Sequence, residues 1–162
     1  MASGVHISVQ QILQTLEHCP FVVGVKSEAP PTGNAIARLT AHTAVPVFGG
    51  LGGVGLLDEL AGGASGAMTG FSRPEALLEA LQAWESGGMA AAHDAFARWL
   101  PLANFEGQPG IGLAVRKEAL RMRGIFDDGA VRPPAPPAPA EMLPMLRQHL
   151  EALNLIESTE ET

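Results

Sequence analysis

The sequence predicts an α/β fold in which about three short parallel strands alternate with helices, followed by a helical segment. Two apolar runs, at 21–25 and 45–49, have the length and the β-branched composition of buried strands, and a run of small residues at 66–70 forms a third. Segments with leucines at helical spacing separate the runs. With 162 residues, 46% hydrophobic and 17% charged, the chain is predicted to be globular rather than disordered.

Each element of the first part has a local signal. Ser8 followed by Gln11 is a capping-box pattern, and Asn34 is a residue type that caps helices. Glycines lie on both sides of the third helix. In chain order, the predicted elements are a helix over 8–18, a strand over 21–25, a helix over 34–42, a strand over 45–49, a helix between the glycines at 50–55 and 62–63, and a strand over 66–70.

The rest of the chain is predicted to be helical. Residues 72–75, Ser-Arg-Pro-Glu, form another capping-box pattern with proline in the first turn. The residues expected on the buried face of the helix that follows are Leu77, Leu78, Leu81 and Trp84.

Later segments complete the predicted organisation. Helices are expected at about 88–105, 109–123 and 140–155, with a stiff proline-rich connector at 133–139. We expect a partial α/β unit over residues 1–86 and a helical extension over 87–162.

The charge balance limits the partners. Ten basic against 17 acidic residues give a net charge of −7, which argues against binding to nucleic acid or to an anionic membrane. No apolar stretch approaches the roughly 18 residues of a membrane span. The single cysteine, Cys19, cannot form an internal disulfide, and no leader pattern precedes the first helix, so a cytoplasmic protein is expected.

Lys26 is the strongest candidate for chemistry. It ends the first predicted strand, and the carboxyl ends of parallel strands face the active site in open sheets and in barrels. A lysine held among apolar groups loses hydration, and its neutral amine is a nucleophile toward carbonyls. The alternative is an exposed lysine that ends the strand and serves solubility.

Two other sequence features, the glycines at 50–55 and the histidines, are weaker candidates for a functional site. The glycines at 50–55 satisfy the dinucleotide-binding pattern after a strand, but the following strand does not end in the acidic residue that would contact a ribose. A tight turn or a close backbone approach explains these glycines better than dinucleotide binding does. The five histidines are scattered, so no metal site is predicted.

Together, the motifs resemble a known family. Residues 22–26 (VVGVK), 47–50 (VFGG) and 62–69 (GGASGAMT) are similar, in order and spacing, to the second half of the dihydrodipicolinate synthase and N-acetylneuraminate lyase family. The most specific part is the strand end G-[IV]-K, followed about 40 residues on by G-A-x-G-x-[IM]-[ST]. The resemblance implies the C-terminal part of a (β/α)8 barrel with a helical extension.

The resemblance also implies an activity. Members are class I aldolases and dehydratases that act on pyruvate or related 2-keto acids and need no metal or diffusible cofactor. By resemblance, Lys26 forms the Schiff base on the sixth strand, Gly50 lines the mouth from the seventh, and Met68 lies against the bound keto acid from the eighth.

Three features depart from the family pattern. Leu51 and Gly52 stand where many lyases have acidic or polar residues, and the loop 27–32 differs from the common K-E-[AS]-[ST]-G-[DN] form. The chain has no tyrosine, although the family uses one as a proton relay on a strand before the lysine.

Three strands cannot close a barrel that needs eight strands and at least about 200 residues. The residues expected to lie uncovered on the inward face are Val23, Val25, Val47 and Met68. We expect a homo-oligomer or a complementing half-barrel as partner. A non-catalytic oligomerising or interaction fragment is the alternative to the enzyme, and a dinucleotide-binding module is the third reading.

Overall fold

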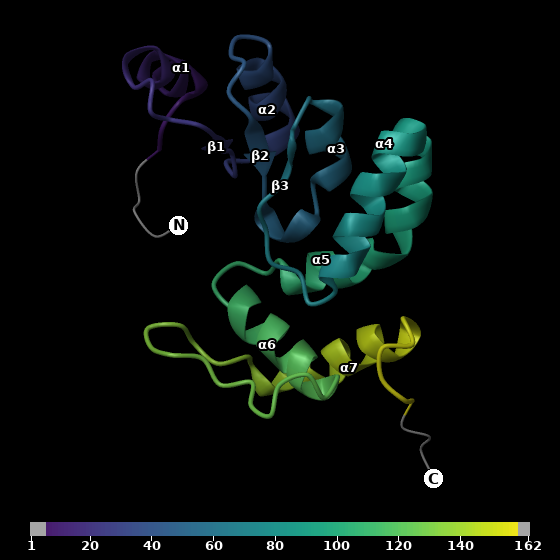
Figure 1. Ribbon diagram of the computed structural model, residues 1–162. Helices are drawn as coiled ribbons and strands as arrows, with labels where there is room; N and C mark the ends of the chain where they lie inside the picture. Colours follow the sequence, from purple (N-terminus) through teal and green to yellow (C-terminus); the bar gives the residue numbers. More distant parts are fainter. Residues whose placement is uncertain (1–5, 159–162) are drawn as a thin grey trace. The chain divides into compact units, whose positions relative to one another are not determined.

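The computed structural model describes residues 6–158 of the chain, which form two compact units. Unit 1 comprises the described residues up to Leu51 together with Gly55–Thr69, and unit 2 comprises Gly52–Val54 and the described residues from Gly70 onward. Figure 1 shows the elements in chain order. No helix among the described residues is long and apolar enough to cross a membrane.

Unit 1 alternates helices and strands, as the sequence predicts. Its three strands pair in parallel in the order β1-β2-β3, with Val25 opposite Val47 and Phe48 opposite Gly66. This confirms the three-stranded parallel sheet. The elements are α1 (Val9–His18), β1 (Val25–Lys26), α2 (Thr32–Thr40), β2 (Val47–Gly49), α3 (Leu56–Ala61) and β3 (Gly66–Ala67).

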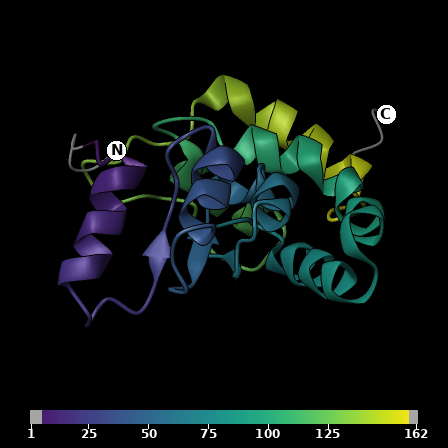
Figure 2. The same ribbon diagram turned by 90° about the horizontal axis from the view of Figure 1, so that it is seen from above.

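The first strand is much shorter than predicted. Phe21 and Val23 are 80% and 83% exposed, and both precede β1: Phe21 lies in the turn that follows α1, and Val23 lies between this turn and the strand. Figure 2 shows the segment that joins α1 to β1. The strands inside a buried parallel sheet have a neighbouring strand on each edge. Among the described residues β1 pairs with β2 alone, so it is an edge strand. The prediction of a fully buried strand over 21–25 is therefore wrong.

The helix-facing side of the sheet forms the core of unit 1. Val47 is fully buried against Ile36 and Leu39 of α2, and Val25 packs on the same cluster. The prediction that Val25 and Val47 face inward is therefore wrong, because side chains alternate along a strand and the helices cover this side. Phe48 points to the opposite face, where a Cβ at Gly66 would lie 3.7 Å from its ring.

The helix starts of unit 1 follow local chemistry. The predicted capping box of α1 is present: the Ser8 hydroxyl accepts from the Gln11 N–H at 3.2 Å, and Gln11 Oε1 accepts from the Ser8 N–H at 2.9 Å. In α2 the N-cap is Pro31, so Asn34 lies inside the helix and does not cap it. The predicted helix after residue 55 is confirmed as α3, which Gly62 follows as C-cap.

Unit 2 is helical. Gly88, with φ 64° and ψ −152°, interrupts α4 in the region where the sequence predicts a new helix. Its elements are α4 (Pro74–Phe96), the 3₁₀ turn η2 (Ala97–Trp99), α5 (Leu100–Glu106), α6 (Gly112–Met122), the 3₁₀ turn η3 (Ala140–Met142) and α7 (Leu143–Ala152). The largest fully buried apolar residues of the unit are Phe96, Leu102, Val115, Leu146 and Leu150. On α4, Leu77 is buried but Leu78 is 58% exposed, so the expected burial of Leu78 is wrong.

The predicted second capping box does not form. Ser72 instead donates its N–H to Glu106 Oε2 at 2.9 Å and its hydroxyl to Glu106 Oε1, while Glu75 pairs with Arg73. In a capping box the serine hydroxyl would accept a helix N–H, whereas here it donates to Glu106. A carboxylate is a strong hydrogen-bond acceptor, and Glu106 is fully buried. Burial raises the pKa of Glu106, an effect that the Ser72 hydrogen bonds oppose.

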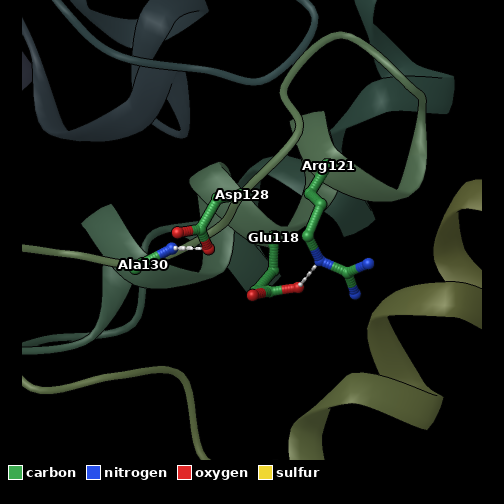
Figure 3. A network of polar contacts seen from close by, with 4 residues as sticks. All are labelled: Glu118, Arg121, Asp128 and Ala130. Atoms are coloured by element: carbon green, nitrogen blue, oxygen red, sulfur yellow. Dashed lines mark hydrogen bonds and ion pairs between the residues drawn. The ribbon is translucent and has the colours of Figure 1, made fainter.

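Basic residues of α6 make structural contacts. Arg121 Nε donates to Glu118 Oε2 at 2.7 Å, and in the loop that follows Asp128 Oδ1 accepts from the Ala130 N–H at 2.8 Å (Figure 3). The Lys117 ammonium donates to the Ala130 carbonyl. The Lys117 bond joins the loop to the helix, whereas the other two lie within the helix and within the loop.

Candidate functional site

The carboxyl edge of the sheet in unit 1 brings the three predicted site residues onto neighbouring strand ends. Lys26 is the last residue of β1, Gly50 directly follows β2, and Met68 directly follows β3. Backbone hydrogen bonds from Ser27 N–H to the Phe48 carbonyl at 2.8 Å and from Met68 N–H to the Gly49 carbonyl at 3.0 Å extend the ladder to this edge. The parallel sheet thus gathers residues that lie far apart in the sequence.

Lys26 has a polar environment rather than the apolar one expected. Its side chain is 39% exposed, and its Nζ lies 3.3 Å from Glu28 Oε2. The expectation of a lysine dehydrated among apolar groups is therefore wrong for this chain, since only one edge of β1 is covered. The pair joins a potential nucleophile to a potential proton acceptor.

Glu28 joins the ends of β1 and β2. Besides pairing with Lys26, it accepts the Leu51 N–H on Oε1 at 3.2 Å. A Cβ at Gly50 would overlap this oxygen, so the carboxylate lies directly on the glycine backbone. Gly50 is buried, and it allows Glu28 to reach Leu51.

Met68 presents an apolar side chain at the end of β3. It is 57% exposed, while the glycine and alanine of β3 that precede it are small. A flexible thioether of this kind suits contact with an apolar part of a small ligand. Its contact with a keto acid stays a prediction.

A second carboxyl group, Glu59 of α3, lies behind the end of β2. Its side chain is fully buried, and neither oxygen has a hydrogen bond of normal geometry among the described residues. The Thr32 hydroxyl and the Gly50 N–H come close enough to offset part of its desolvation. Burial raises the pKa of Glu59, and the negative charges of Glu28 and Asp58 raise it further.

The glycines at 50–55 form a tight turn. Leu51, Gly52 and Gly53 have φ values of 50°, 72° and 81°, a conformation that glycine adopts at little cost. The helix that follows, α3, has six residues. The turn explanation of the pattern is confirmed. No group of three metal-ligating side chains gathers within residues 6–158.

Sequence reasoning missed Glu28 and Glu59 as parts of the site. Glu28 lies two residues after Lys26, at the spacing that returns an extended chain to the same side. Glu59 lies at helical spacing with Leu56 and Leu60, which are both buried, so the apolar stripe of α3 contains one acid. The acid among the apolar residues of α3 was the sequence feature that could have indicated a buried carboxyl group.

Comparisons with known proteins identify relatives. No family model matches the chain. The chain is 30% identical over 155 residues to an L-2-keto-3-deoxyarabonate dehydratase of Azospirillum brasilense, a match that covers 94% of this chain and 48% of that protein.

Solved structures share the fold. The crystal structure of dihydrodipicolinate synthase from Rhodopseudomonas palustris superposes with a TM-score of 0.82 at 29% identity, covering 90% of this chain and 50% of that one. YagE of E. coli K12, a prophage protein of the dihydrodipicolinic acid synthase family solved in complex with pyruvate, superposes with a TM-score of 0.78 at 22% identity over 91% and 51% of the two chains.

These relatives confirm the resemblance and the barrel-type fold of which the three strands form a part. The chain is similar to members of the dihydrodipicolinate synthase family, and it spans about half the length of the relatives that it matches.

Proposed function

We propose that this chain carries the Schiff-base lysine of a lyase or synthase that acts on pyruvate or a related 2-keto acid. The observation that carries the proposal is the placement of Lys26 at the carboxyl edge of a parallel sheet, beside Glu28 and next to Gly50 and Met68 in the strand order. The activity is proposed for a barrel in which further strands complete the site.

The chemistry follows from an amine beside a carboxylate. Lys26 gives a proton to Glu28, and the free Nζ attacks the keto carbon of the substrate. Loss of the carbonyl oxygen as water leaves an iminium ion. The iminium withdraws electrons, so a carbanion can form at the neighbouring carbon or be released there when a bond breaks.

The relatives support this substrate class. One is named as a dehydratase of a 2-keto-3-deoxy acid, another is a dihydrodipicolinate synthase, and a third was solved with pyruvate. The exposed Met68 offers an apolar contact that suits a methyl or methylene group of such a keto acid.

The open edge of the sheet favours a second candidate, a non-catalytic fragment that oligomerises or binds a partner. Phe21 and Val23 are largely exposed beside β1, whose outer edge has no strand partner among the described residues. Apolar residues beside an open strand edge are typical of surfaces that pair with another chain. A complementing half-barrel or a second copy would cover them.

Trapping with borohydride separates the two candidates. The chain is incubated with pyruvate and borohydride, alone and with a polypeptide that carries the preceding strands of a family member, and its intact mass is measured. We expect an adduct that is lost in Lys26→Ala and kept in Lys117→Ala, the matched control, because these are the two lysines of the chain. No adduct under either condition would leave the interaction fragment as the better account.

A further inference from the structure

Glu59 is a buried acid of unit 1 that the proposed Schiff-base chemistry does not use. A fully buried carboxyl group without a hydrogen bond of normal geometry is costly, and a chain rarely keeps one without a role. The apolar residues on either side of it on the same helix face, Leu56 and Leu60, show that leucine would fit the pattern.

The position of the carboxyl group points to the site. A Cβ at Gly49 would overlap Glu59 Oε2, so the group lies directly against the last residue of β2. A Cβ at Gly55 would lie 3.2 Å from Glu59 Oε1 and 3.1 Å from the Thr32 hydroxyl. The carboxyl group is therefore enclosed by the backbone at both ends of the turn and by the start of α2.

A short path leads from this carboxyl group to Lys26. The Gly50 N–H faces Glu59, the next N–H, of Leu51, donates to Glu28 Oε1 at 3.2 Å, and Glu28 Oε2 lies 3.3 Å from Lys26 Nζ. Glu59 thus contacts one side of the peptide segment whose other side holds Glu28. Moving this segment would move the carboxylate that pairs with the lysine.

We propose that Glu59 is a positioning residue, a buried carboxyl group that holds the Gly49–Leu51 backbone in place and through it sets Glu28 against Lys26. The inference rests on the proposed function for its catalytic consequence, but the positioning itself is a property of this chain. The contacts described for Glu59 are with the backbone of the turn and with Thr32, so its proposed effect on the lysine passes through Glu28.

The charges around Glu59 favour its protonated form over its ionised form. The charged groups that act on Glu59 are Glu28, from the loop after β1, and Asp58, its neighbour on α3, and both are negative. The groups from α2 and from the end of β2, the Thr32 hydroxyl and the Gly50 N–H, carry no net charge. An ionised Glu59 would be repelled by the negative charges of both Glu28 and Asp58.

The test follows the Gly50 and Leu51 amide resonances of the full ¹⁵N-labelled chain from about pH 4 to pH 9. We expect both amides to report a transition above the ordinary glutamate range, lost in Glu59→Gln and kept in Asp58→Asn. Absence of this transition from the unsubstituted chain, or its survival in Glu59→Gln, would overturn the proposal.

A second measurement gives the catalytic consequence. The rate of pyruvate trapping is expected to fall about tenfold to a hundredfold in Glu59→Leu, with Glu59→Gln restoring most of it. An unchanged rate in Glu59→Leu would count against positioning. If the unsubstituted chain traps no pyruvate even with the complementing polypeptide, the proposed function fails, and the amide titration alone decides the role of Glu59.

Discussion

At the residue scale, the end of β2 is limited by the two carboxyl groups packed against it. Gly49 faces Glu59 and Gly50 faces Glu28, and at both positions a Cβ would overlap a carboxylate oxygen. The glycines are therefore required by close approach, and they fix where the two acids lie relative to the backbone.

Gly49→Ala tests this packing. The added methyl group must displace the buried Glu59 side chain, so we expect the free energy of unfolding to fall by about 1–3 kcal/mol, as in other overpacked cores. Urea denaturation measures the change. Gly24→Ala is the control, because a Cβ there would have only ordinary contacts, 3.5 Å from the Phe48 ring, and it should change stability by less than about 0.5 kcal/mol.

The raised pKa of Glu59 predicts a pH dependence of stability. The folded chain binds this proton more tightly than the unfolded chain, in which the carboxyl group titrates near its ordinary value of 4.5. The stabilisation is complete below that value and is lost as the pH rises through the raised folded value. Urea unfolding from about pH 4 to pH 8 should show stability falling with pH relative to Glu59→Gln.

The control for this comparison is Asp58→Asn, which should keep the fall because Glu59 is still present. Parallel curves for the unsubstituted chain and Glu59→Gln would mean that Glu59 is already ionised in the folded protein.

At the element scale, α1 depends on the cap at its start. No residue of α1 is fully buried, so packing contributes less to this helix than to the others of unit 1. The reciprocal bonds between Ser8 and Gln11 are then a large part of what fixes its first turn.

Ser8→Ala should destabilise α1 by about 0.5–2 kcal/mol. The Gln11 N–H loses its acceptor, and the reciprocal bond from the Ser8 N–H to Gln11 is weakened with it. Local hydrogen exchange of the α1 amides measures the loss. Ser8→Asp retains an N-cap acceptor and should keep protection near that of the unsubstituted chain. Equal exchange in all three proteins would show that the cap contributes nothing in solution.

Elements that depend on residues close together in the sequence were predictable, and those that depend on contacts between distant residues were not. The α1 cap needs two residues three positions apart, so the sequence sufficed for it. Ser72 carries the same pattern, but Glu106, 34 positions away, takes both of its donors. The alternation of strands and helices was readable, whereas the length of β1 depends on what covers its outer edge.

The site divides in the same way. The position of Lys26 at a strand end was predictable because apolar runs mark strands. Its pairing with Glu28 required the turn after β2, whose Leu51 N–H orients that carboxylate. The burial of Glu59 required the geometry of α3 on the sheet, which no single residue reveals.

At the scale of the whole molecule, the exposed apolar residues before β1 predict association. We expect the chain at micromolar concentration to scatter light as a dimer or larger species, because Phe21 and Val23 adjoin an open strand edge. Val23→Lys should reduce the association, since a charged residue beside an edge opposes pairing.

Leu78→Lys serves as the control, because Leu78 is also a largely exposed apolar residue but lies on α4, in unit 2. It should leave the association unchanged. A monodisperse monomer that binds no hydrophobic dye would contradict the prediction and the need for a covering partner.

The order of the sheet also bears on how quickly unit 1 is reached from the unfolded chain. Each strand pairs with the next strand along the sequence, β1 with β2 and β2 with β3, and one short helix lies in each connection. Short loop closures cost little entropy, and folds rich in such neighbouring contacts fold faster than those that must join distant segments. The strand pairing in the sheet that carries Lys26 therefore joins only segments that lie between residues 25 and 67 of the chain.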